Sequence, residues 1–350
     1  MGDSGNFAPV AVTIGEPAGI GPEILLKAIQ SGSVREGAFG VGPISVWQEV
    51  ASALGNRVTI TSINRPAEAR DRRDDTCLPI IDVEGSPTYA PGEIRAEASQ
   101  AALEAIKTAV ALAKTGEASA IVTNPINKDA FASIGFEFPG HTEYLGHLCS
   151  NDSYKPKPVM MLASPQLRVV PTTIHIPLSE VPAHLTADLL EQTIKITVGS
   201  LRRDFGIEAP RIAVAGLNPH AGENGRLGHE DDTIVRPVVQ SLFESGFDVT
   251  GPYSADTLFH ETARNAYDAC ICMYHDQALI PIKTIAFDDA VNVTLGLPII
   301  RTSPDHGTAL DIAGRGIARP DSLIHAINLA GEMARNRKKV DTRTAHHSRD

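Results

Sequence analysis

Three histidines share a position relative to apolar segments of the chain. His175, His220 and His275 each stand at or just past the C-terminal end of a short apolar run, at 167–174, 211–216 and 269–273. Runs of this length and composition are typical of buried strands. The carboxyl ends of parallel strands lie along one edge of a sheet, so we expect the three imidazoles to converge. Three neutral imidazoles suit a catalytic divalent ion. Zn²⁺ is preferred, with Co²⁺, Mg²⁺ and Mn²⁺ as alternatives; three separate structural histidines are the competing interpretation.

Charged side chains also stand among apolar residues near the C-terminal end of the chain. Lys283 and Arg301 are flanked by Ile, Pro and Leu, which favours an anion held against a buried wall over two surface salt bridges. Asp256, Asp276 and Lys283 are candidate catalytic bases. We interpret Asp276 mainly as a partner that orients His275, whereas Asp256 could equally cap a helix.

The elements that must position these residues form an alternating pattern. Short β-branched runs alternate with alanine-rich amphipathic runs, which predicts an α/β fold with a largely parallel sheet. The predicted strands include 10–14, 44–47, 58–63, 120–123 and 159–163, and the predicted helices include 94–114, 187–203 and 232–244. The glycine-rich stretch 15–23 matches neither a dinucleotide fingerprint nor a P-loop, so a tight turn and a ligand loop both stay open.

Composition limits the class of protein. The 350 residues suffice for two domains or one large domain, and a formal net charge of -11 argues against nucleic acid or an anionic membrane as partner. No run of about 18 apolar residues predicts a membrane span, and no signal-peptide pattern opens the chain. The four cysteines do not form a disulfide framework, which indicates a reducing cytoplasm. We expect Cys270 and Cys272 to be buried thiols.

Long polar runs then carry a resemblance over nearly the whole chain, from Val10 to Ala334. The sequence closely resembles the 4-hydroxythreonine-4-phosphate dehydrogenase (PdxA) family of vitamin B6 biosynthesis. The runs are GEPAGIGPEI at 15–24, NPINK at 124–128, FPGHTEYL at 138–145, LNPHAGENG at 217–225, GPYSADTLF at 251–259, MYHDQALIPIK at 273–283 and VNVTLGLPIIRTSPDHGTALDIAG at 291–314.

The resemblance implies a fold and an assembly. It implies two α/β/α domains with a cleft between them, as in isocitrate and isopropylmalate dehydrogenases, in a homodimer whose active site is shared between subunits. We expect the first domain at 1–138 plus 306–334, the second, with the metal and dimer contacts, at 139–305, and a disordered tail at 335–350.

The resemblance also implies a reaction and its residues. It implies NAD-dependent oxidation of 4-phosphooxy-L-threonine at C3 followed by decarboxylation to 3-amino-2-oxopropyl phosphate. The family's metal positions fall on His175, His220 and His275. Its substrate positions fall on His141, Thr142, Lys283, Asn292 and Arg301.

The cofactor prediction concerns the residues after the last of these positions. His306, Gly307, Thr308, Ala309 and Asp311 lie in a run similar to the adenosine-binding loop of isopropylmalate and isocitrate dehydrogenases. Small residues let the backbone approach a nucleotide. A carboxylate at Asp311 can accept a hydrogen bond from the ribose 2′-OH and would repel a 2′-phosphate, so we predict NAD over NADP.

Three alternatives stay open. A sister enzyme would oxidise D-threonate or D-erythronate 4-phosphate. An acyltransferase like phosphate acetyltransferase would share the general fold without needing three converging histidines. A non-catalytic nucleotide-binding protein would bind NAD and metal without turnover.

Overall fold

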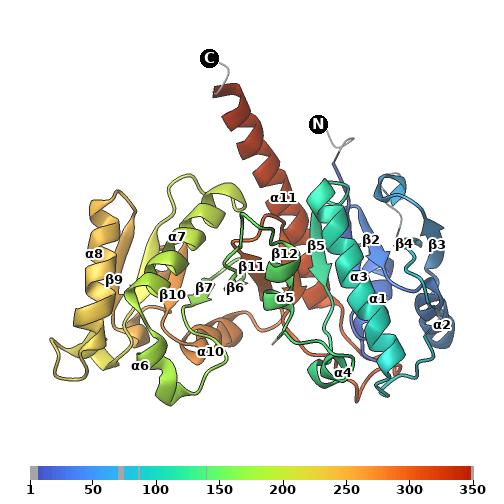
Figure 1. The fold of residues 1–350 in the computed structure, drawn as a ribbon, viewed down its shortest axis with the longest axis horizontal. Helices are drawn as coiled ribbons and strands as arrows, with labels where there is room; N and C mark the ends of the chain where they lie inside the picture. The colour runs from blue at the N-terminus through green and yellow to red at the C-terminus, as the bar shows by residue number, and fades with distance from the viewer. Residues whose placement is uncertain (1–6, 70–74, 86, 139, 348–350) are drawn as a thin grey trace. The chain divides into compact units, whose positions relative to one another are not determined.

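A computed structural model describes residues 7–69, 75–85, 87–138 and 140–347. The chain divides into two compact units (Figure 1). Unit 1 comprises residues 1–158 and 297–335, and unit 2 comprises 159–296 and 336–350. Among the described residues, no helix combines the length and apolarity that crossing a bilayer requires.

Unit 1 is built on parallel strands in the order β3-β4-β2-β1-β5-β12. These strands are β1 (Val10–Thr13), β2 (Ala38–Val41), β3 (Thr59–Ile63), β4 (Cys77–Ile81), β5 (Ala120–Thr123) and β12 (Arg301–Pro304). The helices are α1 (Gly21–Gln30), α2 (Ile44–Leu54), α3 (Ala96–Thr115), α4 (Lys128–Ser133), α5 (His141–Leu148) and the first half of α11 (Asp321–His347), with a short 3₁₀ turn η1 (Pro66–Ala69).

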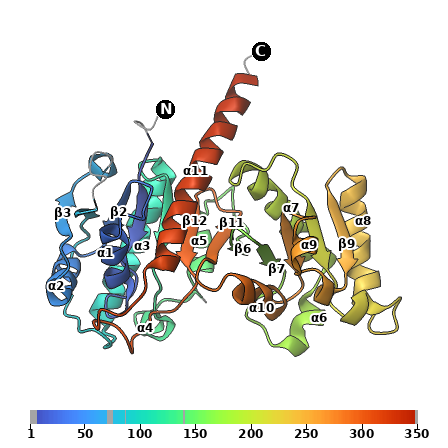
Figure 2. The same cartoon turned by 180° about the vertical axis from the view of Figure 1, so that it is seen from behind.

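The strand order of unit 1 places its helices on both faces of the sheet. Right-handed crossovers carry α1 and α2 along one face as the chain moves outward from β1. The chain then returns through α3 to β5 on the other side of β1, so α3 covers the opposite face (Figures 1 and 2). The order therefore reverses between β1 and β5, where open α/β sheets bind ligands. The buried Trp47 of α2 packs where a side chain on Gly40 would stand, 3.0 Å from its ring.

Unit 2 has the strand order β11-β6-β7-β10-β8-β9, in which β6 runs antiparallel to both neighbours. Its strands are β6 (Val159–Ala163), β7 (Arg168–Pro171), β8 (Ile212–Ala215), β9 (Val249–Tyr253), β10 (Ala269–Cys272) and β11 (Val291–Leu295). Its helices are α6 (Val181–His184), α7 (Ala187–Arg203), α8 (Arg236–Glu244), α9 (Glu261–Arg264) and α10 (His275–Ile285). Short turns are η2 (Leu178–Glu180), η3 (Pro219–Gly222), η5 (Ala255–Thr257) and the π-helical turn η4 (Asp231–Val235). Cys270 and Cys272 are fully buried, as expected.

Three expectations about the elements are corrected. Residues 44–47 open helix α2 rather than a strand, since Pro43 precedes them as N-cap and the strand lies earlier, at β2. Residues 139–158 and 297–305 belong to unit 1 rather than to the second domain, because α5 packs on α3 and β12 pairs with β5. The tail is not disordered at 335–347, which continue α11; Arg337 pairs there with the buried Asp204. Residues 348–350 lie outside the described part.

Candidate active site

The three histidines follow three adjacent strands of unit 2. β7, β10 and β8 are neighbours and run parallel, so their carboxyl ends share one edge of the sheet. His175 follows β7, His275 opens α10 after β10, and His220 lies in η3 after β8. The three histidines therefore lie at the same edge of the sheet, as their strand-end positions predicted. That they bind a metal ion there stays a prediction.

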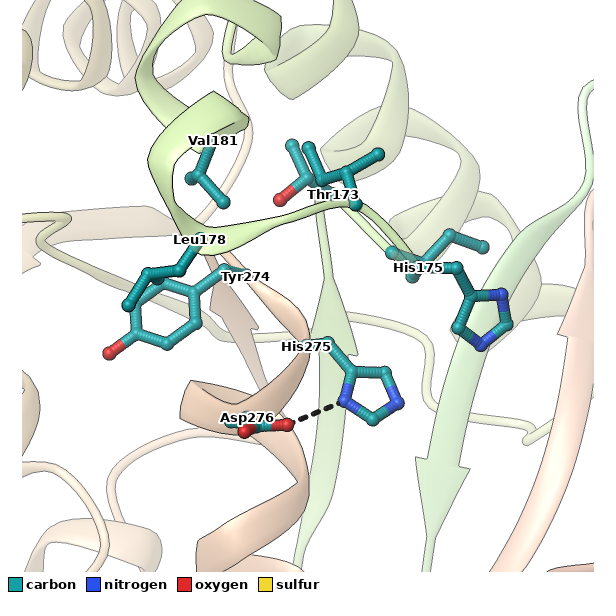
Figure 3. Close-up of a pocket in the computed structure, with 9 residues that line it drawn as sticks. Thr173, His175, Leu178, Val181, Tyr274, His275 and Asp276 are labelled. Atoms are coloured by element: carbon teal, nitrogen blue, oxygen red, sulfur yellow. Dashed lines mark hydrogen bonds and ion pairs between the residues drawn. The ribbon is translucent and has the colours of Figure 1, made fainter.

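Two of these rings stand at a distance that suits a common ion. The ring centroids of His175 and His275 are 5.6 Å apart. Two imidazoles bound to one ion through bonds of roughly 2.1 Å have centroids about 5 Å apart. Figure 3 shows both rings beside a cavity of about 210 Å³ that Thr173, Leu178 and Tyr274 also line. The donor chemistry and spacing of this pair fit a divalent ion.

The third histidine is not gathered with the other two within one chain. Among the described residues, no set of three His, Cys, Asp or Glu side chains could hold a metal ion. His220 instead lies near Asp256, whose pKa is lowered by the Ser254 hydroxyl, with a smaller contribution from His220. One chain therefore supplies a pair of rings and a third imidazole on the neighbouring strand end.

Backbone strain marks two of the three histidines. His175 and His220 have φ values of 50° and 52°, in the left-handed region that residues with a side chain rarely adopt. Ala221, Glu223 and Asn224 after His220 are left-handed as well. Such conformations cost about 1–3 kcal/mol each and persist only where the surroundings enforce them.

The buried carboxylate of Asp231 enforces the loop that carries His220. Its Oδ1 accepts the backbone N–H of Leu217 at 2.7 Å, and its Oδ2 accepts the backbone N–H and the side-chain amide of Asn218, both at 3.0 Å. Asp231 has no exposed surface and opens the π-helical turn η4. Turns of this type often occur at functional sites. We therefore regard Asp231 as a positioning residue for His220.

Two further polar side chains tie the three strand ends together. Gln277 accepts the backbone N–H of Met273 at 2.7 Å and donates to the carbonyl of Gly216 at 2.8 Å, which joins the ends of β10 and β8. Thr173 donates its hydroxyl to the carbonyl of Met273 at 2.8 Å, which joins β7 to β10. These hydrogen bonds join the ends of the three strands into one frame, and the three histidines follow those strands.

The candidate bases of unit 2 differ in what they contact. Asp276 Oδ1 lies 2.7 Å from His275 Nδ1, which leaves Nε2 of that ring for a ligand, as the orienting role requires (Figure 3). Asp256 is exposed and accepts from the hydroxyl of Ser254, and it lies inside η5 rather than at a helix N-cap. Lys283 is half-buried on α10.

Among the predicted substrate residues of unit 1, Arg301 carries the positive charge. Arg301 is 4% exposed at the start of β12, and its Nε and Nη2 donate to Thr123 Oγ1 at 3.1 and 2.7 Å. Burial lowers the pKa of Arg301 to about 10, although Glu143 opposes the shift. A buried guanidinium of this kind suits an anionic ligand.

His141 lies in the same surroundings but is neutral. Burial, and then the positive charges of Arg301 and Lys128, lower the pKa of His141 to about 3. Its Nε2 is buried and has no hydrogen-bond partner among the described residues, so it is available to a ligand. Thr142 follows in the first turn of α5, where backbone N–H groups favour anions. In unit 2, Asn292 on β11 likewise has a buried Oδ1 without a partner in the described part of the chain.

The predicted cofactor loop rests on the glycine-rich stretch of unit 1. The backbone N–H of Ile20 donates to the carbonyl of Thr308 at 3.0 Å, and a Cβ on Gly19 would stand 2.8 Å from the same oxygen. Ala309 has a φ of 44°, and His306 Nδ1 lies 3.0 Å from the Gly307 carbonyl. Residues 15–22 are buried. Of the two readings left open, a supporting turn describes them better than a ligand loop.

Comparison with known proteins identifies the family. The model of the family described as pyridoxal phosphate biosynthetic protein PdxA matches residues 37–330. The chain belongs to this family. It is 49% identical over 336 residues to a protein of Bradyrhizobium diazoefficiens named 4-hydroxythreonine-4-phosphate dehydrogenase, covering 93% of this chain and 97% of that protein. The resemblance stated from the sequence is confirmed.

Solved structures agree with this family and confirm the α/β fold. A 4-hydroxythreonine-4-phosphate dehydrogenase from Klebsiella pneumoniae aligns with a TM-score of 0.85 at 40% identity, over 93% of this chain and 99% of that one. A terephthalate 1,2-cis-dihydrodiol dehydrogenase from Burkholderia xenovorans aligns at 0.65 and 28% identity, over 93% and 98%. These relatives are dehydrogenases, and thus oxidoreductases, by name.

Proposed function

We propose that this protein is a 4-hydroxythreonine-4-phosphate dehydrogenase of pyridoxal phosphate biosynthesis. It oxidises the C3 alcohol of 4-phosphooxy-L-threonine, transferring a hydride to NAD and releasing a proton. The β-keto acid loses CO₂ and takes up a proton to give 3-amino-2-oxopropyl phosphate. The 5.6 Å spacing of the His175 and His275 rings, in a chain of the PdxA family, carries the proposal.

The residues of unit 1 recognise the anionic groups of the substrate. Arg301 offers a guanidinium fixed by Thr123, and a phosphate or carboxylate bound there gains charge-assisted hydrogen bonds. Neutral His141 adds a directional hydrogen bond from Nε2 without a further charge. Thr142 completes the group at the start of α5.

The residues of unit 2 bind the substrate around C3, where the reaction takes place. His175, His220 and His275 would hold a divalent ion, Zn²⁺ by preference, and such an ion would polarise the alcohol and carbonyl oxygens of the substrate. Asp276 keeps Nδ1 of His275 in its hydrogen bond and so aims Nε2 outward. Asn292 binds substrate through its free Oδ1. The proton of the C3 alcohol passes to Lys283 or Asp256.

The active site is shared within a homodimer in this proposal. The described residues of one chain bring two imidazoles together without a complete set of three donors, so we propose that a second copy completes the donor set. Mixing inactive His175→Ala and His220→Ala chains tests this arrangement. Partial recovery of activity on subunit exchange is expected, and no recovery in a verified mixed dimer contradicts sharing.

The deciding experiment follows NAD reduction with purified protein and 4-phosphooxy-L-threonine. Turnover is expected, it should disappear after chelation, and it should return with added divalent metal. D-Threonate 4-phosphate, D-erythronate 4-phosphate and a terephthalate dihydrodiol serve as comparison substrates. Faster turnover of any of these would refute the substrate assignment. Activity that survives chelation would refute the proposed metal requirement.

A further inference from the structure

A second cavity lies at the other edge of the unit 2 sheet, where β7, β8 and β10 begin. It has a volume of about 310 Å³. Its walls are the turn between β6 and β7, the amino ends of these strands, and α9 with the segment that follows it (Figure 2 shows α9). The histidines stand at the carboxyl ends of the same strands, so this cavity is separate from the candidate active site.

The lining of this cavity is basic. Three arginines, Arg168, Arg211 and Arg264, face two carboxylates, Glu261 and Asp268, which leaves an excess of one positive charge. An excess of guanidinium groups in a hollow of this size is suited to an anion.

Two of the three arginines are held in place by contacts within the protein. Arg211 grips Asp268 with its Nη2 at 3.0 Å and its Nε at 3.2 Å, and it donates to the carbonyl of Asn265 at 3.1 Å. Arg168 donates to the backbone carbonyl of Asp268 at 3.2 Å and lies over the ring of Phe205, 5.2 Å from its centre. The carboxylate of Asp268 is therefore committed to Arg211 and cannot neutralise a third cation.

The third arginine is placed differently. Arg264 closes α9, and its Nη1 is buried yet has no hydrogen-bond partner among the described residues. A buried guanidinium N–H without an acceptor costs about 1–3 kcal/mol or more, and native proteins rarely leave one unsatisfied. A bound anion would supply the acceptor.

We propose that this cavity binds a small organic oxyanion, with the guanidinium of Arg264 as its main anchor. Guanidinium groups recognise phosphate and carboxylate oxygens with the same paired geometry, so both classes share this chemistry. The volume suits a compact molecule, and Leu167 and Tyr267 add an apolar wall against which a short carbon skeleton packs. The turn that carries Leu167 is held by the hydroxyl of Ser164, which accepts the N–H groups of Gln166 and Leu167.

The location is tested first with crystals of the full-length protein soaked in selenate, a tetrahedral anion that gives an anomalous signal. We expect a peak within hydrogen-bond distance of Arg264 in the wild type and no such peak in Arg264→Gln. A wild-type map with anomalous peaks elsewhere but none in this cavity would overturn the proposal.

Titration calorimetry with inorganic phosphate and with malonate then separates the two ligand classes. Arg264→Gln is expected to weaken anion binding at this cavity, seen as one set of sites in the titration, by about tenfold or more, since a charge-assisted hydrogen bond is lost. Arg264→Lys, which keeps the charge without the fork, should fall between. Arg236→Gln, which removes an exposed arginine paired with Asp232 outside the cavity, is the matched control and should bind as the wild type does. Equal affinities in all four proteins would refute the site.

Discussion

The two units hold the loops that carry the predicted cofactor and metal residues at equivalent sheet edges but by different means. In unit 1 the loop 306–311 is held by close backbone contact, because Gly19 leaves room for the Thr308 carbonyl and Gly92 for that of Leu310. In unit 2 the histidine loops are held by side chains, with Asp231 and Gln277 as the main acceptors. The first arrangement should be sensitive to added volume and the second to lost hydrogen bonds.

The largest effect is expected at the proposed metal site of unit 2. His275→Ala should lower kcat/KM by about a thousandfold, because several kcal/mol of stabilisation of the developing charge depend on the ion. Metal analysis should show that the variant no longer retains the ion. His184→Ala removes an exposed imidazole of the same unit and should change neither quantity. A fully active, metal-loaded His275→Ala protein would refute the metal assignment.

Asp231→Asn tests the hydrogen bonds that hold the His220 loop, because asparagine has the same shape as aspartate. An amide group replaces one oxygen that accepts from Leu217 or Asn218, so the left-handed loop at His220 loses part of its support. Metal affinity should fall by about ten- to a hundredfold, as for other partners of metal ligands. Competition with a metal chelator measures the affinity. Asp232→Asn removes the neighbouring half-buried carboxylate, which pairs with Arg236, and should leave the affinity unchanged.

Gly19→Ala is the matching test in unit 1. The added methyl would stand 2.8 Å from the Thr308 carbonyl, so loop 306–311 must shift. NAD affinity should weaken by about tenfold, and stability should drop by ~1–3 kcal/mol. Calorimetric titration with NAD and urea denaturation measure the two effects. Gly199→Ala, at a helix position with nothing within 4 Å of the new Cβ, should leave NAD binding as it is.

Asp311→Lys should change selectivity more than stability. The exposed carboxylate is proposed to accept from the ribose 2′-OH, and a lysine there would attract a 2′-phosphate. The ratio of kcat/KM for NAD to that for NADP should fall by several-fold or more. An unchanged ratio would remove Asp311 from the cofactor site.

A further prediction concerns acid stability in unit 1. The pKa of His141 falls to about 3 in the folded protein, below the ordinary value of 6.5, so the unfolded chain binds a proton that the folded chain does not. The contribution of His141 is therefore complete above about pH 6.5 and is lost as pH falls towards 3, by up to ~1.4 kcal/mol per pH unit. His141→Gln should lose less stability than the wild type between pH 7 and 5. Urea denaturation at both pH values measures the difference.

Local patterns in the sequence predicted the elements well where periodicity was strong. Helix 187–203 and strands 120–123 and 159–163 match the structure residue for residue. Residues 44–47 were assigned wrongly because a short apolar run suits a buried helix as well as a strand. The tail was assigned wrongly because its apolar pattern is weak, while ion pairs such as Arg337 with Asp204 support the helix.

The frame around the histidines was not predictable in the same way. The strand-end positions of His175, His220 and His275 were visible in the sequence, but the strand order that makes them neighbours depends on long-range pairing. Asp231 and Gln277 were missed because each acts through backbone groups far away in the sequence, 14 residues for Asp231 with Leu217 and 61 for Gln277 with Gly216. The one available signal was the run NPHAGENG at 218–225. It is rich in residues that tolerate the left-handed backbone found around His220.

Trp47 is the single tryptophan of the chain, and it lies fully buried beside Gly40 in unit 1. Its fluorescence therefore reports the environment of one half of the molecule, while circular dichroism averages over both. A denaturant titration followed by the two signals would show whether the halves melt together or in succession, with no label added.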